Sequence, residues 1–149
     1  MTTETKDKSE YTKALDLMTR YLALRDHSRY ELKTKLNRRF DSKLVDRLLA
    51  EAEDRGWLGD EQEMAERLVL SLERKLKSRR YIEDQLRKKR LPLPAANVES
   101  EIEKARALAE RKFGDLSAIA FEERAKVFRF LKYRGFTDHS IRQVLNAKS

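Results

Sequence analysis

The stretch SRYELKTKLNRR, residues 28–39, is the most informative part of the sequence because its pattern returns twice further along the chain. It comes back as SRRYIEDQLRKK at residues 78–89 and, without the serine, as RAKVFRFLKYR at residues 124–134. Each copy carries two apolar residues four positions apart: Leu32 and Leu36, Ile82 and Leu86, Val127 and Leu131. A period of about 45 to 50 residues is typical of a stacked array whose units cover one another's apolar faces.

The similarity extends upstream between the first two copies, where Met18, Leu22 and Arg25 align with Leu68, Leu72 and Lys75. Apolar residues recur at helical spacing throughout, and no segment alternates with a period of two, so we expect no sheet. Helix ends are marked by a capping box of Ser28 with Glu31, and by Gly56, Gly114 and Gly135 as stops.

These signals predict an all-α, monomeric chain of three tandem three-helix repeats in an elongated, curved array. Leu36, Leu86 and Leu131 are expected to be buried seam residues. The expected organisation is a disordered N-terminal tail over residues 1–10 and repeats over residues 11–59, 60–102 and 103–149.

Composition points to an anionic partner. The 149 residues include 34 Lys and Arg against 26 Asp and Glu, which gives a net charge of +8. A basic excess favours nucleic acid or an acidic protein surface, although simple solubility is an alternative explanation. Only 4 Gly and 2 Pro are present, which argues against a turn-rich β fold.

Several kinds of chemistry have no candidate residues. There is no cysteine, so disulfides and thiolate metal sites are excluded. His27 and His139 are expected at the surface of turns, in cap or solvent roles, and no glycine-rich phosphate loop is present. We therefore expect no enzyme, no cofactor and no metal. The polar N-terminal residues do not make a secretory signal, and no apolar run approaches the ~20 residues that span a bilayer, so the expected location is cytoplasmic.

Basic residues concentrate in the middle helix of each repeat. The candidate surface for a partner or nucleic acid consists of Arg25, Arg29, Arg39, Lys75, Arg79, Arg80, Arg87, Lys89, Arg124, Lys132 and Arg134. Neighbouring aromatic residues, including Tyr81 and Tyr133, could stack on bases or could complete the edge of the core.

Two groups of these cations have different alternatives. Arg39, Lys89 and Arg134 fall in last turns, where a cation suits the helix dipole. Arg29 and Arg79 fall in first turns, where a cation is mildly unfavourable. A nearby carboxylate or an external anion should therefore hold Arg29 and Arg79, and we expect an external anion.

Four motifs together resemble the RecX family, the bacterial modulators of the RecA recombinase. They are LRDHSxxELxxKL at residues 24–36, RGWLxD at 55–60, KFG at 112–114 and RFLxYRGF at 129–136, and the resemblance covers about residues 11–146. The middle repeat departs from the family pattern at KSR, residues 77–79, and at RLPLP, residues 90–94.

The resemblance implies tandem three-helix repeats that bind in the helical groove of the RecA–DNA filament. It also implies inhibition of RecA ATPase, strand exchange and coprotease activity by a protein without enzymatic activity of its own. From its charge, the chain is expected to bind bare single- or double-stranded DNA weakly. The alternative is a helical nucleic-acid-binding protein that acts on DNA or RNA without a recombinase, and a third possibility is a structural adaptor.

Overall fold

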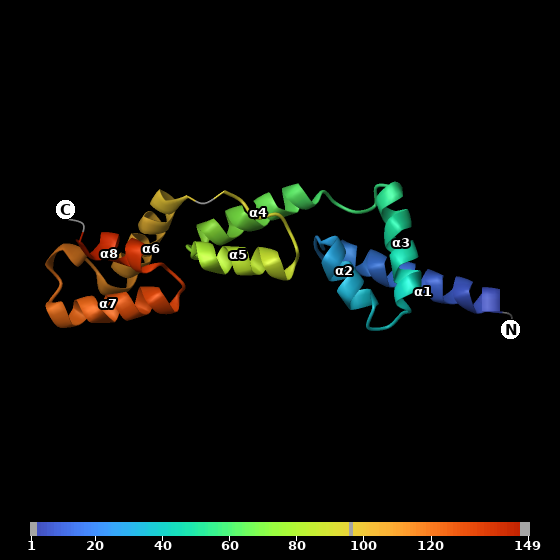
Figure 1. Cartoon of the computed structure of the whole chain (residues 1–149), viewed down its shortest axis with the longest axis horizontal. Helices are drawn as coiled ribbons and strands as arrows, with labels where there is room; N and C mark the ends of the chain where they lie inside the picture. Colours follow the sequence, from blue (N-terminus) through green and yellow to red (C-terminus); the bar gives the residue numbers. More distant parts are fainter. Residues whose placement is uncertain (1–2, 96, 147–149) are drawn as a thin grey trace. The chain divides into compact units, whose positions relative to one another are not determined.

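The computed structural model describes residues 3–95 and 97–146, and these contain helices but no strand. The prediction of an all-α fold is therefore confirmed, while the elongated, curved outline stays a prediction. The helices are α1 (Thr3–Leu24), α2 (Arg29–Leu36), α3 (Ser42–Asp54), α4 (Glu61–Arg74), α5 (Arg79–Lys88), α6 (Val98–Phe113), the short 3-10 helix η1 (Leu116–Ala118), α7 (Phe121–Tyr133) and α8 (Asp138–Asn146) (Figure 1).

The chain divides into two compact units. Unit 1 runs to Met64 and also holds Lys89–Pro92, whereas unit 2 holds Ala65–Lys88 and the chain from Leu93 onward. These two units do not coincide with the three predicted repeats, because residues of the middle repeat are shared between them.

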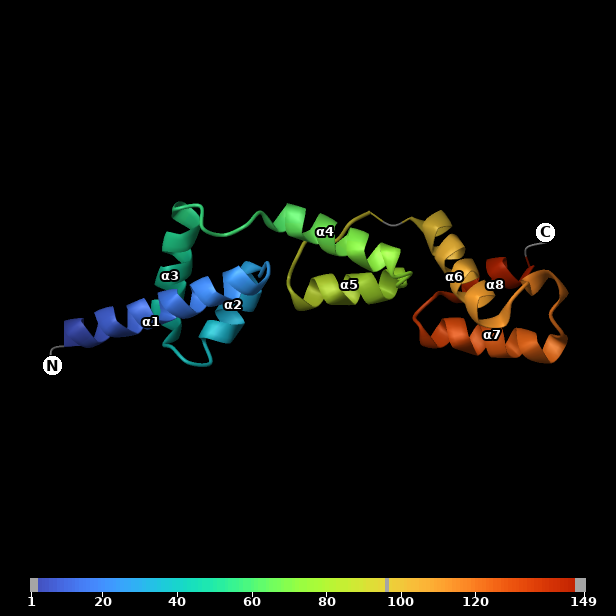
Figure 2. The same ribbon diagram turned by 180° about the vertical axis from the view of Figure 1, so that it is seen from behind.

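Unit 1 is a three-helix packing in which α3 crosses α1 (Figure 2). Apolar residues of the three helices meet in one core, which consists of Ala14, Met18, Leu32, Leu36, Val45, Leu48, Leu49 and Ala52. The capping box forms as predicted: Glu31 N donates to Ser28 Oγ at 3.2 Å, and Ser28 N donates to the Glu31 carboxylate at 3.1 Å. The capping box therefore marks the start of α2, and the buried Leu32 and Leu36 pack this helix into the core.

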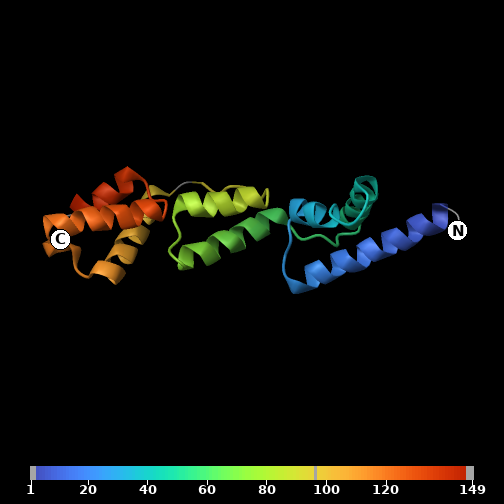
Figure 3. The ribbon, with the colours of Figure 1, turned by 90° about the horizontal axis from the view of Figure 1, so that it is seen from below.

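In unit 2, α5 and the part of α4 from Ala65 onward lie side by side as a helical hairpin (Figure 3). Helices α6, α7 and α8 pack around a second core. This core consists of Ala105, Leu108, Ala109, Val127, Leu131, Phe136, Ile141 and Val144. The three predicted seam residues, Leu36, Leu86 and Leu131, are all fully buried.

Two boundary predictions are wrong. Helix α1 already begins at Thr3, so residues 3–10 of the predicted disordered tail are helical, and Met1 and Thr2 lie outside the described residues. Helix α6 runs without a break across the predicted repeat boundary between residues 102 and 103, so the described residues form eight α-helices rather than nine. The physical reason is that Ile102, Ala105 and Ala109 share one apolar face and no Gly or Pro interrupts them.

Candidate nucleic-acid interface

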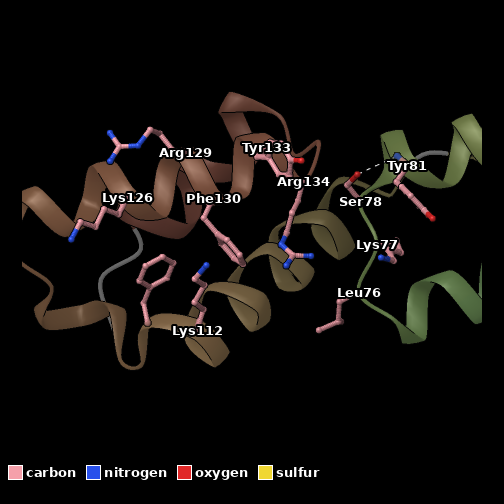
Figure 4. A pocket seen from close by; sticks show the side chains of 11 residues that line it. Leu76, Lys77, Ser78, Tyr81, Lys112, Lys126, Arg129, Phe130, Tyr133 and Arg134 are labelled. Carbon is pink, nitrogen blue, oxygen red and sulfur yellow. Dashed lines mark hydrogen bonds between the residues drawn. The ribbon is translucent and has the colours of Figure 1, made fainter.

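Unit 2 contains a pocket of about 710 Å³ that is rich in cations and aromatic rings. We call it the basic pocket, and Figure 4 shows its side chains. One wall comes from the turn between α4 and α5 and the start of α5, and the other comes from the end of α6 and from α7. The lining residues are Leu76, Lys77, Ser78, Tyr81, Lys112, Phe113, Lys126, Arg129, Phe130, Tyr133 and Arg134.

Helix α7 supplies most of one wall because its two faces differ. Val127 and Leu131 are fully buried in the core of unit 2. On the helix side away from these two residues, Lys126, Arg129 and Tyr133 recur at intervals of three and four, so they line one surface. Tyr133 is 94% exposed, which is unusual for so large a ring and leaves its face free for a ligand.

The charge of the basic pocket is one-sided: five of its lining side chains are cationic and none is a carboxylate. Several of these cations lie over aromatic rings. Lys77 Nζ is 4.9 Å from the centroid of Tyr81, while Lys112 Nζ and the Arg134 guanidinium carbon are 4.6 Å and 4.7 Å from the centroid of Phe130. Rings can hold cations in place without neutralising them. The basic pocket therefore keeps its full positive charge for an anionic ligand.

A second pocket of unit 2, of about 630 Å³, provides a contrast. Its lining holds three cations and three carboxylates: Arg79, Arg80 and Lys132 with Glu83, Glu101 and Asp138. Lys132 donates to Asp138 at 2.6 Å, and Arg79 Nε donates to Glu83 at 2.7 Å. Since charge is balanced there, the basic pocket is the stronger candidate for an anion site.

Comparison with known proteins identifies relatives of this chain. The family model described as RecX, third three-helix domain, matches residues 99–145, which include most of α6 together with α7 and α8. The regulatory protein RecX of Cronobacter sakazakii is 34% identical, over 97% of this chain and 97% of its own length. The regulatory protein RecX of Escherichia coli is 32% identical over 97% of this chain and 96% of its own length.

This chain belongs to the RecX family. Solved RecX structures have the same fold: the crystal structure of RecX from Lactobacillus salivarius matches with a TM-score of 0.75 at 19% identity, covering 93% of this chain and 96% of that one. A second crystal structure of regulatory protein RecX matches with a TM-score of 0.74 at 19% identity, covering 95% of this chain and 74% of that one. The all-helical RecX fold therefore extends over nearly the whole chain.

Most of the eleven cations predicted to face a partner form an ion pair or a hydrogen bond within this RecX chain. Arg25 and Lys89 both bind Glu31, at 2.7 Å and 3.3 Å. Arg87 lies 3.4 Å from Glu83, and Arg124 donates to Asn146 at 3.1 Å. Lys132 pairs with Asp138, as described above. Arg39, Lys75 and Arg80 are exposed, and of the eleven only Arg134 lines the basic pocket.

Arg29 and Arg79 both have a carboxylate partner within the chain, so the structure favours a nearby carboxylate over the expected external anion. Arg29 forms an ion pair with Glu53, and Arg79 pairs with Glu83. The guanidinium of Arg79 also donates to the backbone carbonyl of Ala95 at 2.7 Å. A nearby carboxylate therefore offsets the unfavourable helix dipole at both positions.

Four cations of the basic pocket were not among the residues predicted from the sequence to face a partner: Lys77, Lys112, Lys126 and Arg129. The spacing of Lys126, Arg129 and Tyr133 places them on one side of α7, so the sequence could have predicted that these three share a surface. No sequence pattern links Lys77 with Lys112, because they lie in separate segments that only the fold brings together.

His27 was expected at the surface of a turn, yet it is buried, with 2% of its surface exposed. Its Nε2 lies 2.9 Å from Lys35 Nζ, and its Nδ1 lies 3.0 Å from the carbonyl oxygen of Arg25. An ammonium group only donates, so Nε2 is the acceptor and Nδ1 carries the proton of a neutral ring. Burial lowers the pKa of His27 below its ordinary value, and the charges of Arg25 and Lys35 lower it further.

Glu31 is a half-buried carboxylate of unit 1 with several cationic and N–H partners. Burial alone would raise its pKa, but hydrogen bonds from Arg25 and from Ser28 N, together with the charge of Lys89, outweigh burial and lower the pKa to about 2. Glu31 is therefore ionised at any physiological pH, and it keeps Arg25 and Lys89 occupied.

Among the described residues, no group of His, Asp or Glu side chains is arranged to hold a metal ion. Within the same part of the chain, no helix has the length and apolar character needed to cross a membrane.

Proposed function

We propose that this RecX-family chain is a non-enzymatic inhibitor of the RecA recombinase that binds in the groove of the RecA–DNA filament. Its regulatory targets would then be homologous recombination, DNA repair and the SOS response. Membership of a family of regulatory proteins supports the choice of function. The observation that carries the proposal is the basic pocket, with five cations and no carboxylate in its lining.

The chemistry of the basic pocket suits DNA held in a filament. Cations bind phosphates by charge-assisted hydrogen bonds, and exposed aromatic faces stack on bases of any sequence. Tyr81 and Tyr133 are 39% and 94% exposed beside these cations, so a phosphate and a base could be bound together. Binding of this kind anchors the protein in the filament without any catalytic group.

The test is RecA ATP hydrolysis on single-stranded DNA, measured against concentration of the chain. Lys112→Glu with Arg134→Glu reverses the two cations that lie over Phe130. Each charge-assisted contact is worth about 1.5–3 kcal/mol, so the concentration for half-inhibition should rise at least about tenfold. The matched control is Lys8→Glu with Lys43→Glu, two exposed lysines of unit 1, which makes the same charge change. Equal inhibition by both double variants would remove the basic pocket from the interface.

The rival function, general binding of nucleic acid, has a separate signature. Bare single-stranded DNA should bind weakly, with log affinity falling by about 0.7 per unit of log salt for each phosphate neutralised. If the wild-type chain binds DNA in this way but leaves RecA ATP hydrolysis unchanged, the inhibitor proposal fails and the general binder replaces it.

A further inference from the structure

A buried lysine joins the two walls of the basic pocket. Lys104, on α6, is 4% exposed, which is rare for a lysine. Its Nζ donates to the carbonyl oxygen of Lys77 at 2.9 Å, lies 3.1 Å from the carboxylate of Glu73 at the end of α4, and pairs with Glu101 on α6. All three donors of the ammonium are therefore used, two of them on the α4–α5 hairpin.

The same cluster holds the start of α5. Glu101 accepts a hydrogen bond from the backbone N of Arg79 at 2.8 Å while it pairs with Lys104. Glu101 thus satisfies one of the free N–H groups at the first turn of α5. The turn between α4 and α5 is bound to α6 at both of its ends.

The turn itself has a backbone that needs external support. Leu76 has φ 58°, in the left-handed region that usually takes glycine, where a side chain costs roughly 1–2 kcal/mol. Its side chain packs against the core of α6, α7 and α8. Such a conformation persists only where surrounding contacts impose it. Several independent contacts therefore fix the position of the α4–α5 turn against α6.

We infer that Lys104 is a positioning residue for the basic pocket: it holds Lys77 and Tyr81 opposite Arg134 and Phe130, so that one ligand is bound by both walls. This inference rests on the proposed function for its ligand, but the positioning itself is a property of the free protein. Lys104 cannot bind the ligand directly, because its three donors are occupied and it is buried.

The first experiment measures the positioning without RecA or DNA. Because the chain has no cysteine, spin labels can be attached uniquely at Asp84→Cys on α5 and Glu122→Cys on α7, both exposed. Pulsed electron resonance should give one narrow distance distribution in the parent protein and a broad one in Lys104→Met. Lys88→Met, which removes an exposed lysine of α5, should leave the distribution narrow.

The second experiment measures ligand binding with a fluorescent oligothymidylate. Lys77→Ala should weaken binding in the parent protein but have no further effect in Lys104→Met, because the wall that carries Lys77 is no longer held in place. Lys104→Met alone should lose about tenfold or more in affinity. If Lys104→Met does not fold, Glu73→Gln, which removes one charge and keeps an acceptor, should broaden the distance distribution to a smaller extent.

The outcomes separate the two proposals. An unchanged distance distribution in Lys104→Met, or an undiminished effect of Lys77→Ala in that background, overturns the positioning role. A broadened distribution in a chain whose parent does not inhibit RecA leaves the positioning role standing and refutes the proposed function.

Discussion

Gly135→Ala is the change that tests the packing of unit 2 most directly. Gly135 follows α7 with φ 94°, and a Cβ placed on it would lie 2.8 Å from Ser78 Oγ. Ser78 is buried, and its Oγ accepts a hydrogen bond from Tyr81 N at 3.1 Å, so it cannot move away freely. We expect alanine at residue 135 to destabilise unit 2 through both backbone conformation and overpacking.

Gly56 provides the reference for the magnitude. Gly56 and Gly135 both end a helix with the same pair of backbone hydrogen bonds, but nothing lies within 4 Å of a Cβ placed on Gly56. Gly56→Ala therefore reports the cost of the left-handed backbone alone, roughly 1–2 kcal/mol. Overpacking adds roughly 1–3 kcal/mol at Gly135. The stiffening of the unfolded chain by alanine is common to both variants and cancels in the comparison.

The assay is native-state hydrogen exchange, which reports the opening free energy of α3 and α7 separately and so treats each unit by itself. A third variant, Ser78→Gly, removes the contacting oxygen and should cost only a few tenths of a kcal/mol as an N-cap. In the double variant with Gly135→Ala, the excess cost should largely disappear. An equal cost at Gly56 and Gly135, or no rescue by Ser78→Gly, would refute the close contact.

Two further predictions concern burial. Leu131→Ala should lower the free energy of unfolding of unit 2 by about 2–5 kcal/mol, because Leu131 is fully buried, whereas the exposed Tyr133→Ala should stay within about 0.5 kcal/mol in urea melts. His27 has a lowered pKa in the folded state, so the unfolded chain binds its proton first as the pH falls below about 6.5, and the stability of unit 1 should decline from there. His27→Gln should remove this part of the decline, and an identical pH profile for both proteins would contradict it.

The ends of the helices were predictable because they depend on neighbours in sequence. Ser28, Gly56 and Gly135 act through backbone groups within a few residues, so their roles follow from local spacing. The length of α6 was not predicted, because the same apolar pattern fits one long helix or two short ones. Only the packing of Ile102 and Ala105 against one core decides between them.

The candidate site was predicted only in part, because the contacts between its charged residues also join parts of the chain that are distant in sequence. Charge segregation indicated the basic helices, but it does not show which cation meets which carboxylate. Arg29 and Glu53 are 24 residues apart, and Lys104 and Glu73 are 31 apart, so their pairing depends on the fold. The cations of the basic pocket likewise come from separate segments, so their meeting in one pocket depends on the fold.

The serine that recurs at residues 28 and 78 both caps a helix and contacts a segment distant in sequence. In unit 1, Ser28 Oγ accepts from Glu31 N within α2 and also donates to the carbonyl oxygen of Lys89 at 2.6 Å. A hydroxyl has one donor and two acceptor positions, so both bonds form at once. The serine that begins one middle helix thus meets the segment that ends the next one.

In unit 2 the corresponding serine, Ser78, caps α5 and lies against Gly135. Gly135 stands where the earlier copy has Arg90, and both have positive φ, 94° and 53°. At Gly135 an added Cβ would meet Ser78 Oγ, so this position favours glycine for a steric reason as well as for its backbone conformation. The repeated serine therefore begins a helix in both units and also contacts the segment that follows a later helix.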